Sequence, residues 1–223
     1  MLLLFIKAVF LVPITLLPII NPLACAPIVA NLLHGTSEQI ERRVARQVAI
    51  NCWVLLLGAI LIGSHVLSFF GISLPIVRIA GGLVVAIGAW KMLNNDVVDS
   101  FRAQASNPET FQEELKIRAF YPISFPLTIG PGTIASSIAI GASLPTRPMA
   151  WMISVGSAVI GALITSILIY LCYRYARQLV NKLGPFGTIV ALRLSAFILL
   201  CIGIEIFWLG LSGALVDLGL ISK

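Results

Sequence analysis

The stretch NPLACAP, residues 21–27, lies inside one of the most apolar segments of this chain. A similar stretch, FPLTIGPG, occupies residues 125–132. Proline has no backbone N–H and its ring clashes with the carbonyl four residues earlier, so both stretches predict breaks in otherwise helical segments. Gly130 and Gly132 add backbone freedom to the second break. In a membrane, such breaks are tolerated only where protein buries them or where they line a wet cavity.

The composition indicates a membrane protein. Of the 223 residues, 59% are hydrophobic and 11% are charged, and the mean hydropathy is +1.02. Soluble domains carry about 25% charged residues, whereas apolar runs of about 20 residues are typical of transmembrane helices. These proportions exclude a separate soluble domain, so we expect a single membrane domain over residues 1–223. The first apolar run lacks a basic flank and a cleavage site, so we expect it to be retained as a span.

Six apolar segments are long enough to span a bilayer, which predicts an all-α polytopic membrane protein. The predicted spans are residues 2–33, 47–69, 74–94, 119–143, 149–173 and 188–212, with the breaks in the first and the fourth. A hydrophilic segment of alternating charge, residues 96–117, predicts a loop with a short surface helix. Thr36 or Ser37 is the expected N-cap of the second helix.

Basic residues gather in the three loops that follow the first, third and fifth spans. These loops hold Arg42, Arg43, Arg46, Arg102, Lys116, Arg118, Arg174, Arg177 and Lys182, whereas the opposite side holds Lys7, Arg147 and Lys223. Loops rich in Lys and Arg stay in the cytoplasm, so the loop at residues 96–117 is predicted to be cytoplasmic and both termini periplasmic. This orientation accounts for the net charge of +6, so no nucleic-acid partner is expected. The expected partners are the lipid bilayer and a small-molecule substrate, with a homo-oligomer as an open alternative.

The two breaks align in register. Residues 18–29, PIINPLACAPIV, match residues 122–133, PISFPLTIGPGT, with three prolines of each segment in equivalent positions. A weaker match relates residues 78–88, RIAGGLVVAIG, to residues 193–203, RLSAFILLCIG. The sequence therefore indicates an internal repeat that includes the breaks.

This repeat divides the chain into two halves of three spans. Repeat 1 covers about residues 1–95 and repeat 2 about residues 118–215. Because three is odd, the halves must cross the membrane in opposite senses. Such inverted repeats are typical of secondary transporters, whose substrate sites are formed by discontinuous helices.

Half-helix N-termini carry partial positive charge and unpaired N–H groups, which suit a carboxylate. Proline kinks that only shape the packing are the alternative, but two breaks in register favour a central binding site. The candidate substrate-binding residues at the breaks are Asn21, Pro22, Pro27, Pro126, Thr128, Gly130, Pro131 and Gly132.

Three of the charged residues inside predicted spans are candidates for a functional role. Arg78 and Arg193 occupy matched positions and are either interfacial anchors or substrate-binding groups at the two mouths of the site. Glu205 is the only acid deep in a predicted span and is the candidate for proton coupling, with pairing to a basic residue or an interfacial position as the alternatives. The four cysteines form no CxxC pair and have no His at ligand spacing, so we expect neither a metal site nor a cofactor.

Four motifs resemble those of the MarC family of bacterial inner-membrane proteins, and the resemblance covers essentially the whole chain. They are NPLACAP at residues 21–27, FGISLPIVRIAGG at 70–82, FPLTIGPGTI at 125–134 and GIEIF at 203–207. The family's usual glycine is Ala24 here, which argues against a strict need for glycine at that position. The resemblance implies six spans in two inverted halves, kinship with the LysE-type exporter superfamily and similarity to a small neutral amino-acid transporter that handles glycine and alanine.

Together these observations predict a multi-pass protein of the bacterial inner membrane. The expected function is secondary transport of small solutes, most of all glycine-like or alanine-like amino acids, by a proton-coupled mechanism or by export. A non-transporting scaffold or accessory protein is the alternative. A membrane-embedded enzyme is disfavoured, because the chain has no HExxH, no GxSxG and no paired intramembrane aspartates.

Overall fold

The computed structural model describes residues 2–33, 35–94, 119–145 and 147–220, in which every regular element is a helix. In chain order these are α1 (Leu2–Ile20), α2 (Pro22–Leu32), α3 (Glu38–Leu61), α4 (Gly63–Phe69), α5 (Leu74–Leu93), the π-helix η1 (Ala119–Thr128), α8 (Pro131–Ala142), α9 (Pro148–Arg174) and α10 (Ala176–Asp217). Helices satisfy their backbone hydrogen bonds internally, as a bilayer requires of a spanning segment. The segment at residues 96–117, with its expected surface helix, lies outside the described residues.

The described residues contain four unbroken helices long and apolar enough to cross a membrane. They are Glu38–Leu61, Leu74–Leu93, Met149–Arg174 and Phe186–Asp217. Two further candidates are bent pairs: Phe5–Ile20 with Pro22–Ala30, at 49°, and Ala119–Thr128 with Pro131–Ala142, at 70°. With each bent pair counted as one span, the total is the predicted six, and the first and fourth spans are the broken ones.

The predicted second span, residues 47–69, ends at Leu61 in the structure, where the short helix α4 follows, and the predicted sixth span, residues 188–212, extends to Asp217. Two helix starts also differ from the prediction. Helix α3 begins at Glu38, well before residue 47, and Arg42, Arg43 and Arg46 lie on this helix instead of in a loop. Acidic residues in its first turn favour the helix N-terminus, and the stripe Val44, Ala45 and Val48 is buried. Ser37 is the N-cap, but its side chain makes no capping hydrogen bond.

The second difference in a helix start concerns the segment after the fifth span. The helical stretch of α10 starts at Ala176, so Arg177 and Lys182 are helical, and the helix is interrupted at Gly184, where φ is 66°. Glycine adopts this left-handed φ without the steric penalty of a Cβ. A short basic helical segment therefore precedes the sixth span.

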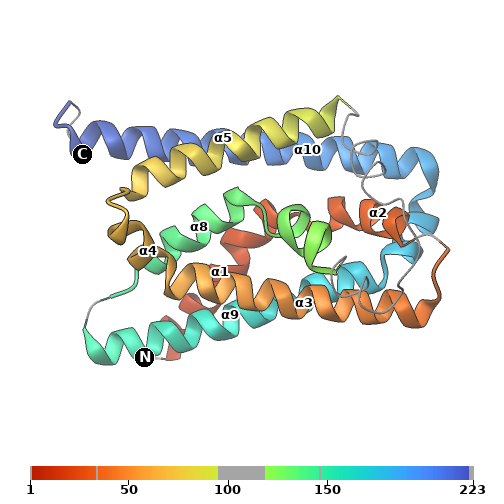
Figure 1. The fold of residues 1–223 in the computed structure, drawn as a ribbon, viewed down its shortest axis with the longest axis horizontal. Helices are drawn as coiled ribbons and strands as arrows, with labels where there is room; N and C mark the ends of the chain where they lie inside the picture. Colours follow the sequence, from red (N-terminus) through yellow and green to blue (C-terminus); the bar gives the residue numbers. More distant parts are fainter. Residues whose placement is uncertain (1, 34, 95–118, 146, 221–223) are drawn as a thin grey trace.

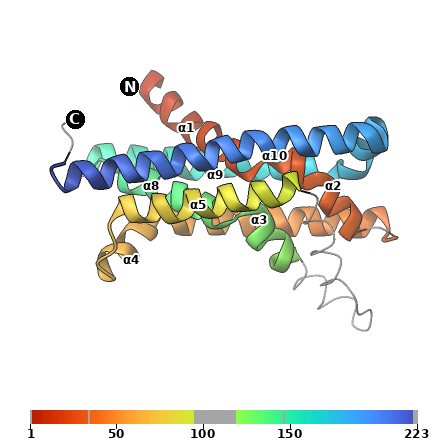
Figure 2. The same cartoon turned by 90° about the horizontal axis from the view of Figure 1, so that it is seen from above.

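Corresponding helices of the two halves run in opposite directions. In Figure 1, α3 and α9 are antiparallel, and so are α5 and α10. The start of α1 and the end of α10 lie at the same end of the bundle, as an even number of spans requires (Figures 1 and 2). The start of α3, the end of α5 and the junction of α9 with α10 share the opposite end, so the basic segments described by the structure lie together.

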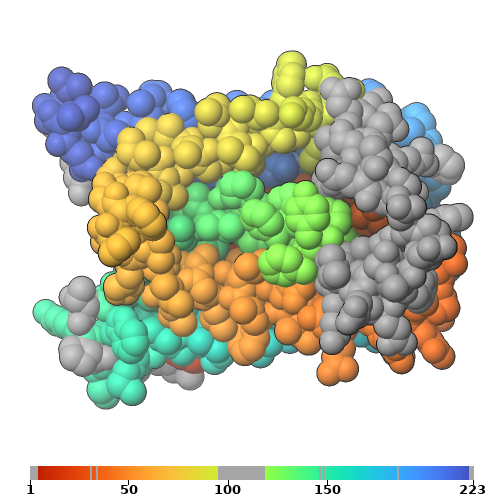
Figure 3. Space-filling model, in the orientation of Figure 1, coloured from red at the N-terminus to blue at the C-terminus, as the bar shows by residue number. Residues whose placement is uncertain are grey.

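The halves interlock instead of packing as separate lobes. Helix α5 packs along α10, and α3 packs along α9. The broken spans pack mainly on the other half: α1 on α9, α2 on α10, η1 on α3, and α8 on α3 and α5. Exchanging the two halves reproduces these pairings, as a two-fold relation between inverted repeats demands. On the face shown in Figure 3, η1 and α8 fill the space between α3 and α5.

The apolar core lies where the broken spans meet α3 and α9. Its fully buried members include Leu16 of α1, Val29 of α2, Leu56 of α3, Ile123 of η1 and Ile169 of α9. The breaks are therefore placed in the interior, where protein covers their backbone.

The contact between α5 and α10 depends on facing glycines. A Cβ added to Gly82 would meet the carbonyl oxygen of Gly203 at 2.7 Å, and one added to Gly203 would meet the backbone nitrogen of Ala86 at 2.6 Å. Small residues permit such close approach of membrane helices, which gain stability from backbone packing. These glycines belong to the weaker of the two repeat matches, and both act as packing residues.

Candidate functional site

The first break is formed around Asn21, between α1 and α2. Its φ is 47°, a left-handed conformation that asparagine tolerates better than most residues. The side-chain oxygen of Asn21 accepts a hydrogen bond from the Ala24 N–H at 3.4 Å, and its amide nitrogen donates to the Ser195 carbonyl of α10 at 3.4 Å. Pro22 then begins α2, where its missing N–H has no consequence. Asn21 thus caps α2 and connects the first break to α10 of the other half by a hydrogen bond.

The second break extends over a longer segment. Within η1, Tyr121 and Phe125 have extended backbone angles. Each precedes a proline, Pro122 or Pro126, and the proline ring disfavours the helical region for the residue before it. The extended Gly130 then forms the N-cap of α8 without a side-chain capping hydrogen bond.

Two side-chain hydroxyls satisfy carbonyls of this irregular segment. Ser124 Oγ donates to the Ala119 carbonyl and Thr128 Oγ1 to the Ile123 carbonyl, each at 2.6 Å. All four residues are buried. Hydroxyl groups commonly take over backbone hydrogen bonds where prolines interrupt a membrane helix, which explains how η1 persists without lipid-facing polar groups.

The two breaks meet in the core. The Cys25 thiol of α2 lies 3.7 Å from the Leu127 carbonyl of η1. Thr128 Oγ1 lies 2.8 Å from the Tyr173 hydroxyl of α9, in a fully buried hydrogen bond. The site thus joins α2, η1 and α9 through uncharged polar groups.

A second hydrogen-bonded chain connects α3 to the same segment. Gln47 Nε2 donates to Asn51 Oδ1 at 3.0 Å, and Asn51 Nδ2 donates to Ser124 Oγ at 3.1 Å. Sequence analysis missed Gln47, Asn51 and Tyr173. The first two could have been found, because polar side chains four residues apart in an apolar span share a helix face.

The other residues predicted at the breaks have different environments. Pro27 is half-buried inside α2, and Pro131 is exposed as the first residue of α8. Gly132 is buried, and the position of an added Cβ is occupied by the Val85 side chain of α5. Gly132 therefore allows α8 to pack closely on α5, and this role is independent of any contact that its backbone N–H makes with a ligand.

The charged candidates lie outside the hydrogen-bonded centre. Arg193 is exposed on α10, two residues before Ser195, which contacts the first break. Arg78 is half-buried on α5, and Glu205 is exposed on α10. Glu205 follows Gly203, which faces α5, by about 200° around the helix, so its side chain points away from α5.

Among the described residues, no group of three His, Cys, Asp or Glu side chains could hold a metal ion. Cys25, Cys52, Cys172 and Cys201 are free thiols. The groups that surround the breaks are hydroxyl, amide, thiol and phenol side chains together with backbone carbonyls. This set can bind a ligand by hydrogen bonds and supplies no ionised partner.

Comparison with known proteins gives one consistent match. Residues 6–215 match the model of the MarC family integral membrane proteins. The chain is 30% identical over 207 residues to the UPF0056 inner membrane protein MarC of Salmonella typhimurium, covering 89% of this chain and 91% of the relative. It is also 30% identical over 203 residues to the protein of the same name from Escherichia coli O1:K1, with the same coverage. No solved structure is significantly similar. The chain, an integral membrane protein with broken first and fourth spans, therefore belongs to the MarC family.

Proposed function

We propose that this protein is a secondary transporter of small neutral solutes and that its substrates are small amino acids such as glycine and alanine. One observation carries the proposal. Two broken spans, one from each inverted half, meet in the core through the contact between Cys25 and Leu127. Discontinuous helices at a repeat interface are the common form of a transporter's substrate site.

The chemistry of the breaks supports a small, electrically neutral substrate. Helix α8 begins without a side-chain cap, and the first N–H groups of a helix lack intrahelical acceptors. Pro131 has no N–H, so Gly132 and Thr133 are the residues whose N–H groups would receive a substrate carboxylate. The hydroxyls of Thr128 and Tyr173 can accept hydrogen bonds from an amino group. The resemblance to a transporter of glycine and alanine agrees with this class.

The described conformation is closed around the breaks. Ala26, Ser124, Thr128 and Ile129 are each at most 1% exposed. In the proposed cycle, rocking of one half against the other opens this centre to each side in turn. The broken spans pack mainly on the opposite half, through α1, α2, η1 and α8. This packing supports the proposed movement, because both broken spans then lie at the interface between the halves, where the rearrangement takes place.

The orientation, direction and coupling of transport form part of the proposal. The basic end of the bundle is cytoplasmic by its charge, which leaves both termini periplasmic in the inner membrane. Transport is by export or by proton coupling. Glu205 is the intramembrane acid to test, although it does not lie at the breaks.

Flux into liposomes that contain only this protein tests the function. We expect radiolabelled glycine or alanine to cross faster than in protein-free liposomes and to be competed by the unlabelled amino acid. Measurements with and without a pH gradient test proton coupling, and flux measured in each direction tests export. If a panel of small neutral solutes shows no protein-dependent flux, the scaffold or accessory role replaces the transporter.

A further inference from the structure

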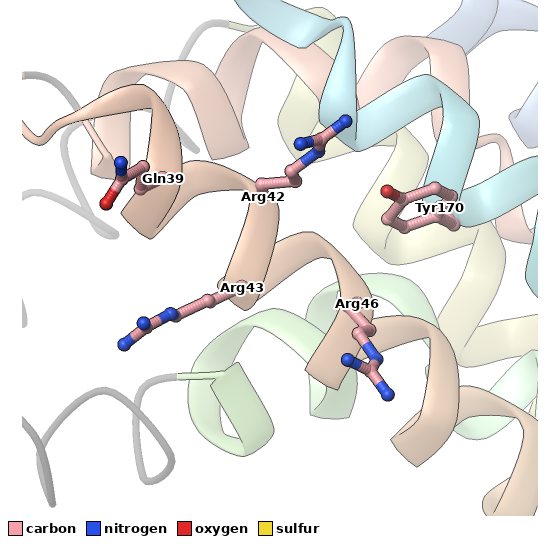
Figure 4. Close-up of a pocket in the computed structure, with 5 residues that line it drawn as sticks. All are labelled: Gln39, Arg42, Arg43, Arg46 and Tyr170. Atoms are coloured by element: carbon pink, nitrogen blue, oxygen red, sulfur yellow. The ribbon is translucent and has the colours of Figure 1, made fainter.

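A cationic cleft lies between α3 and α9 at the basic end of the bundle, away from the breaks. It has a volume of about 480 Å³. Figure 4 shows three arginines on neighbouring turns of α3. Arg42 extends towards α9, which carries Tyr170, whereas Arg43 and Arg46 extend away from α9 in this view. The lining residues are Gln39, Arg42, Arg43, Arg46 and Tyr170.

An apolar groove continues from this cleft along the two helices. It has a volume of about 390 Å³ and shares Arg46 and Tyr170 with the cleft. The remaining lining residues are Ala49, Ile50, Trp53, Leu163, Ser166 and Ile167. Together the cationic cleft and the apolar groove form one continuous site with a charged end and an apolar end.

Ser166 is a buried polar group in the groove with no partner. Its side chain is 3% exposed, and its hydroxyl is the one buried side-chain polar group that makes no hydrogen bond within the described residues. Three other hydroxyls in spans, those of Ser137, Ser157 and Thr165, donate to the carbonyl four residues earlier. A buried hydroxyl without a partner is unfavourable, so a ligand that accepts a hydrogen bond there would stabilise it.

The wall of the cleft is fixed in place by α9. Arg174 Nη1 donates to the Tyr170 hydroxyl at 3.2 Å, and the Arg174 guanidinium lies 5.9 Å from the centre of the Tyr170 ring. The Tyr170 ring, which lines both cavities, is therefore oriented by a residue of its own helix.

We propose that the cleft and groove bind one anionic phospholipid, with its phosphate group at Arg42 and Arg46 and one acyl chain in the groove. Basic pockets between membrane helices on the cytoplasmic side suit anionic head groups, and this end of the bundle is the one that the charge pattern assigns to the cytoplasm. The apolar body excludes a free phosphate as the full occupant, because inorganic phosphate would leave the groove unfilled.

The depth of Ser166 agrees with a glycerolipid. Ser166 precedes Tyr170 by one helical turn, which places it about 6 Å deeper along α9. In a glycerolipid the ester carbonyls follow the phosphate towards the acyl chains. A rotation of the Ser166 side chain presents its hydroxyl to such a carbonyl, which accepts the hydrogen bond that the protein leaves unmade.

Trp53 lines the groove and provides the probe. A variant with Trp90→Phe, Trp151→Phe and Trp208→Phe keeps Trp53 as its only tryptophan. In bilayers of mixed composition, quenching of Trp53 by brominated phosphatidylglycerol is compared with quenching by brominated phosphatidylcholine. We expect the anionic lipid to be preferred by about 25-fold at low salt, because Arg42 and Arg46 each contribute roughly fivefold.

Paired variants separate this site from general surface charge. The double variant Arg42→Gln and Arg46→Gln should reduce the preference to about one. The matched control, Lys91→Gln with Lys182→Gln, removes the same charge at the same end of the bundle outside the groove and should keep the preference within about twofold. Ala49→Phe, which fills the groove, should reduce quenching by both lipids. Ser166→Ala should weaken the binding of both lipids about two- to fivefold, because both carry the ester carbonyls.

Three results would overturn the proposal. Equal quenching by both lipids in the variant that keeps only Trp53 would show that no anionic lipid is selected, and this measurement needs no change in the cleft or the groove. An equal loss in the lysine control would assign the preference to the surface potential. Protection of Trp53 from both lipids would mean that a second copy of the chain covers the groove.

Discussion

The two broken spans share their prolines in register but differ in how they break. The first bends by 49° around a single left-handed residue, Asn21. The second bends by 70° and has two extended residues, Tyr121 and Phe125. Asn21 and Phe125 occupy matched positions of the repeat, so one departure from helical geometry is common to both halves.

The additional irregularity of the second break has a local cause. The residue before Pro18 remains helical, whereas Tyr121, before the matched Pro122, is extended. Only the second segment has hydroxyls, those of Ser124 and Thr128, that bond carbonyls five residues earlier. Proline register therefore sets where a span can break, and in the longer break two hydroxyls satisfy carbonyls of the irregular segment.

The comparison also assigns different tasks to the two helix N-termini. Helix α2 is capped by Asn21, and α8 has no side-chain cap. An internal cap competes with a ligand for the same N–H groups. We therefore expect the N-terminus of α8 to bind the substrate carboxylate. The N-terminus of α2 remains capped by Asn21, which is also hydrogen-bonded to α10.

The largest expected effect is that of Gly132→Val on folding. The new side chain would occupy the place of Val85, and overpacking of this kind costs about 1–3 kcal/mol or more. We expect a marked loss of monodisperse protein in size-exclusion chromatography. The matched position of the first half already carries Ile28, so Ile28→Val is the control and should cost only about 0.5–1.5 kcal/mol. A well-folded Gly132→Val protein would contradict the packing role.

Thr128→Val should have the next largest effect. It preserves shape but leaves the buried Tyr173 hydroxyl without its 2.8 Å partner, at a cost of about 1–3 kcal/mol. Thermal unfolding in detergent measures the loss. Tyr173→Phe and the double variant complete a cycle, and additive effects would mean that the two hydroxyls do not interact.

Asn21 should respond differently to glycine and to alanine. Glycine tolerates the left-handed backbone and loses only the side-chain hydrogen bonds, whereas alanine also incurs a backbone cost of about 1 kcal/mol. Thermal stability should fall in the order parent, Asn21→Gly, Asn21→Ala. The reverse order of the two variants would show that the break relaxes to another backbone conformation.

Cys25→Ala should have the smallest effect. The thiol contact with the Leu127 carbonyl is long, at 3.7 Å, and thiols are weak donors. We expect a change in unfolding free energy of about 1 kcal/mol or less, with transport retained. A large loss of flux with unchanged stability would instead place Cys25 in direct contact with the substrate.

The sequence was sufficient for features that depend on local chemistry. The lengths of the apolar segments predicted six spans, and prolines such as Pro22 and Pro126 located both breaks. The inverted orientation of the two halves followed from the odd number of spans in each half. These properties can be predicted without knowing which helices are in contact.

Features that depend on contacts between helices were not predictable. The role of Gly132 depends on Val85, which lies in a different span, and the Tyr173 hydroxyl matters because Thr128 is beside it. The early start of α3 was missed because its first two turns are polar at the surface, although Val44 and Val48 are buried. The groove at Ser166 exists only where α3 and α9 pack together.

The length of the sixth span has a consequence for the membrane itself. Phe186–Asp217 has 32 residues, or about 48 Å of helix, against a hydrocarbon thickness of about 30 Å. An ordinary tilt of about 20° absorbs little of this excess, so the bilayer must thicken locally or the helix must project from it. The contacts of Gly203 and Gly210 place α5 beside the later part of the helix, which leaves the apolar start near Phe186 and Val190 beyond the end of α5.

The Ser195 carbonyl of this same helix accepts a hydrogen bond from Asn21, so we expect a displacement of α10 to alter the first break. The rate of the proposed transport should therefore depend on bilayer thickness. Flux should vary across liposomes of increasing acyl-chain length and pass through an optimum, and a rate that is independent of chain length would exclude this coupling. A dependence on chain length would show that the surrounding bilayer, through α10, influences the residue around which the first span bends.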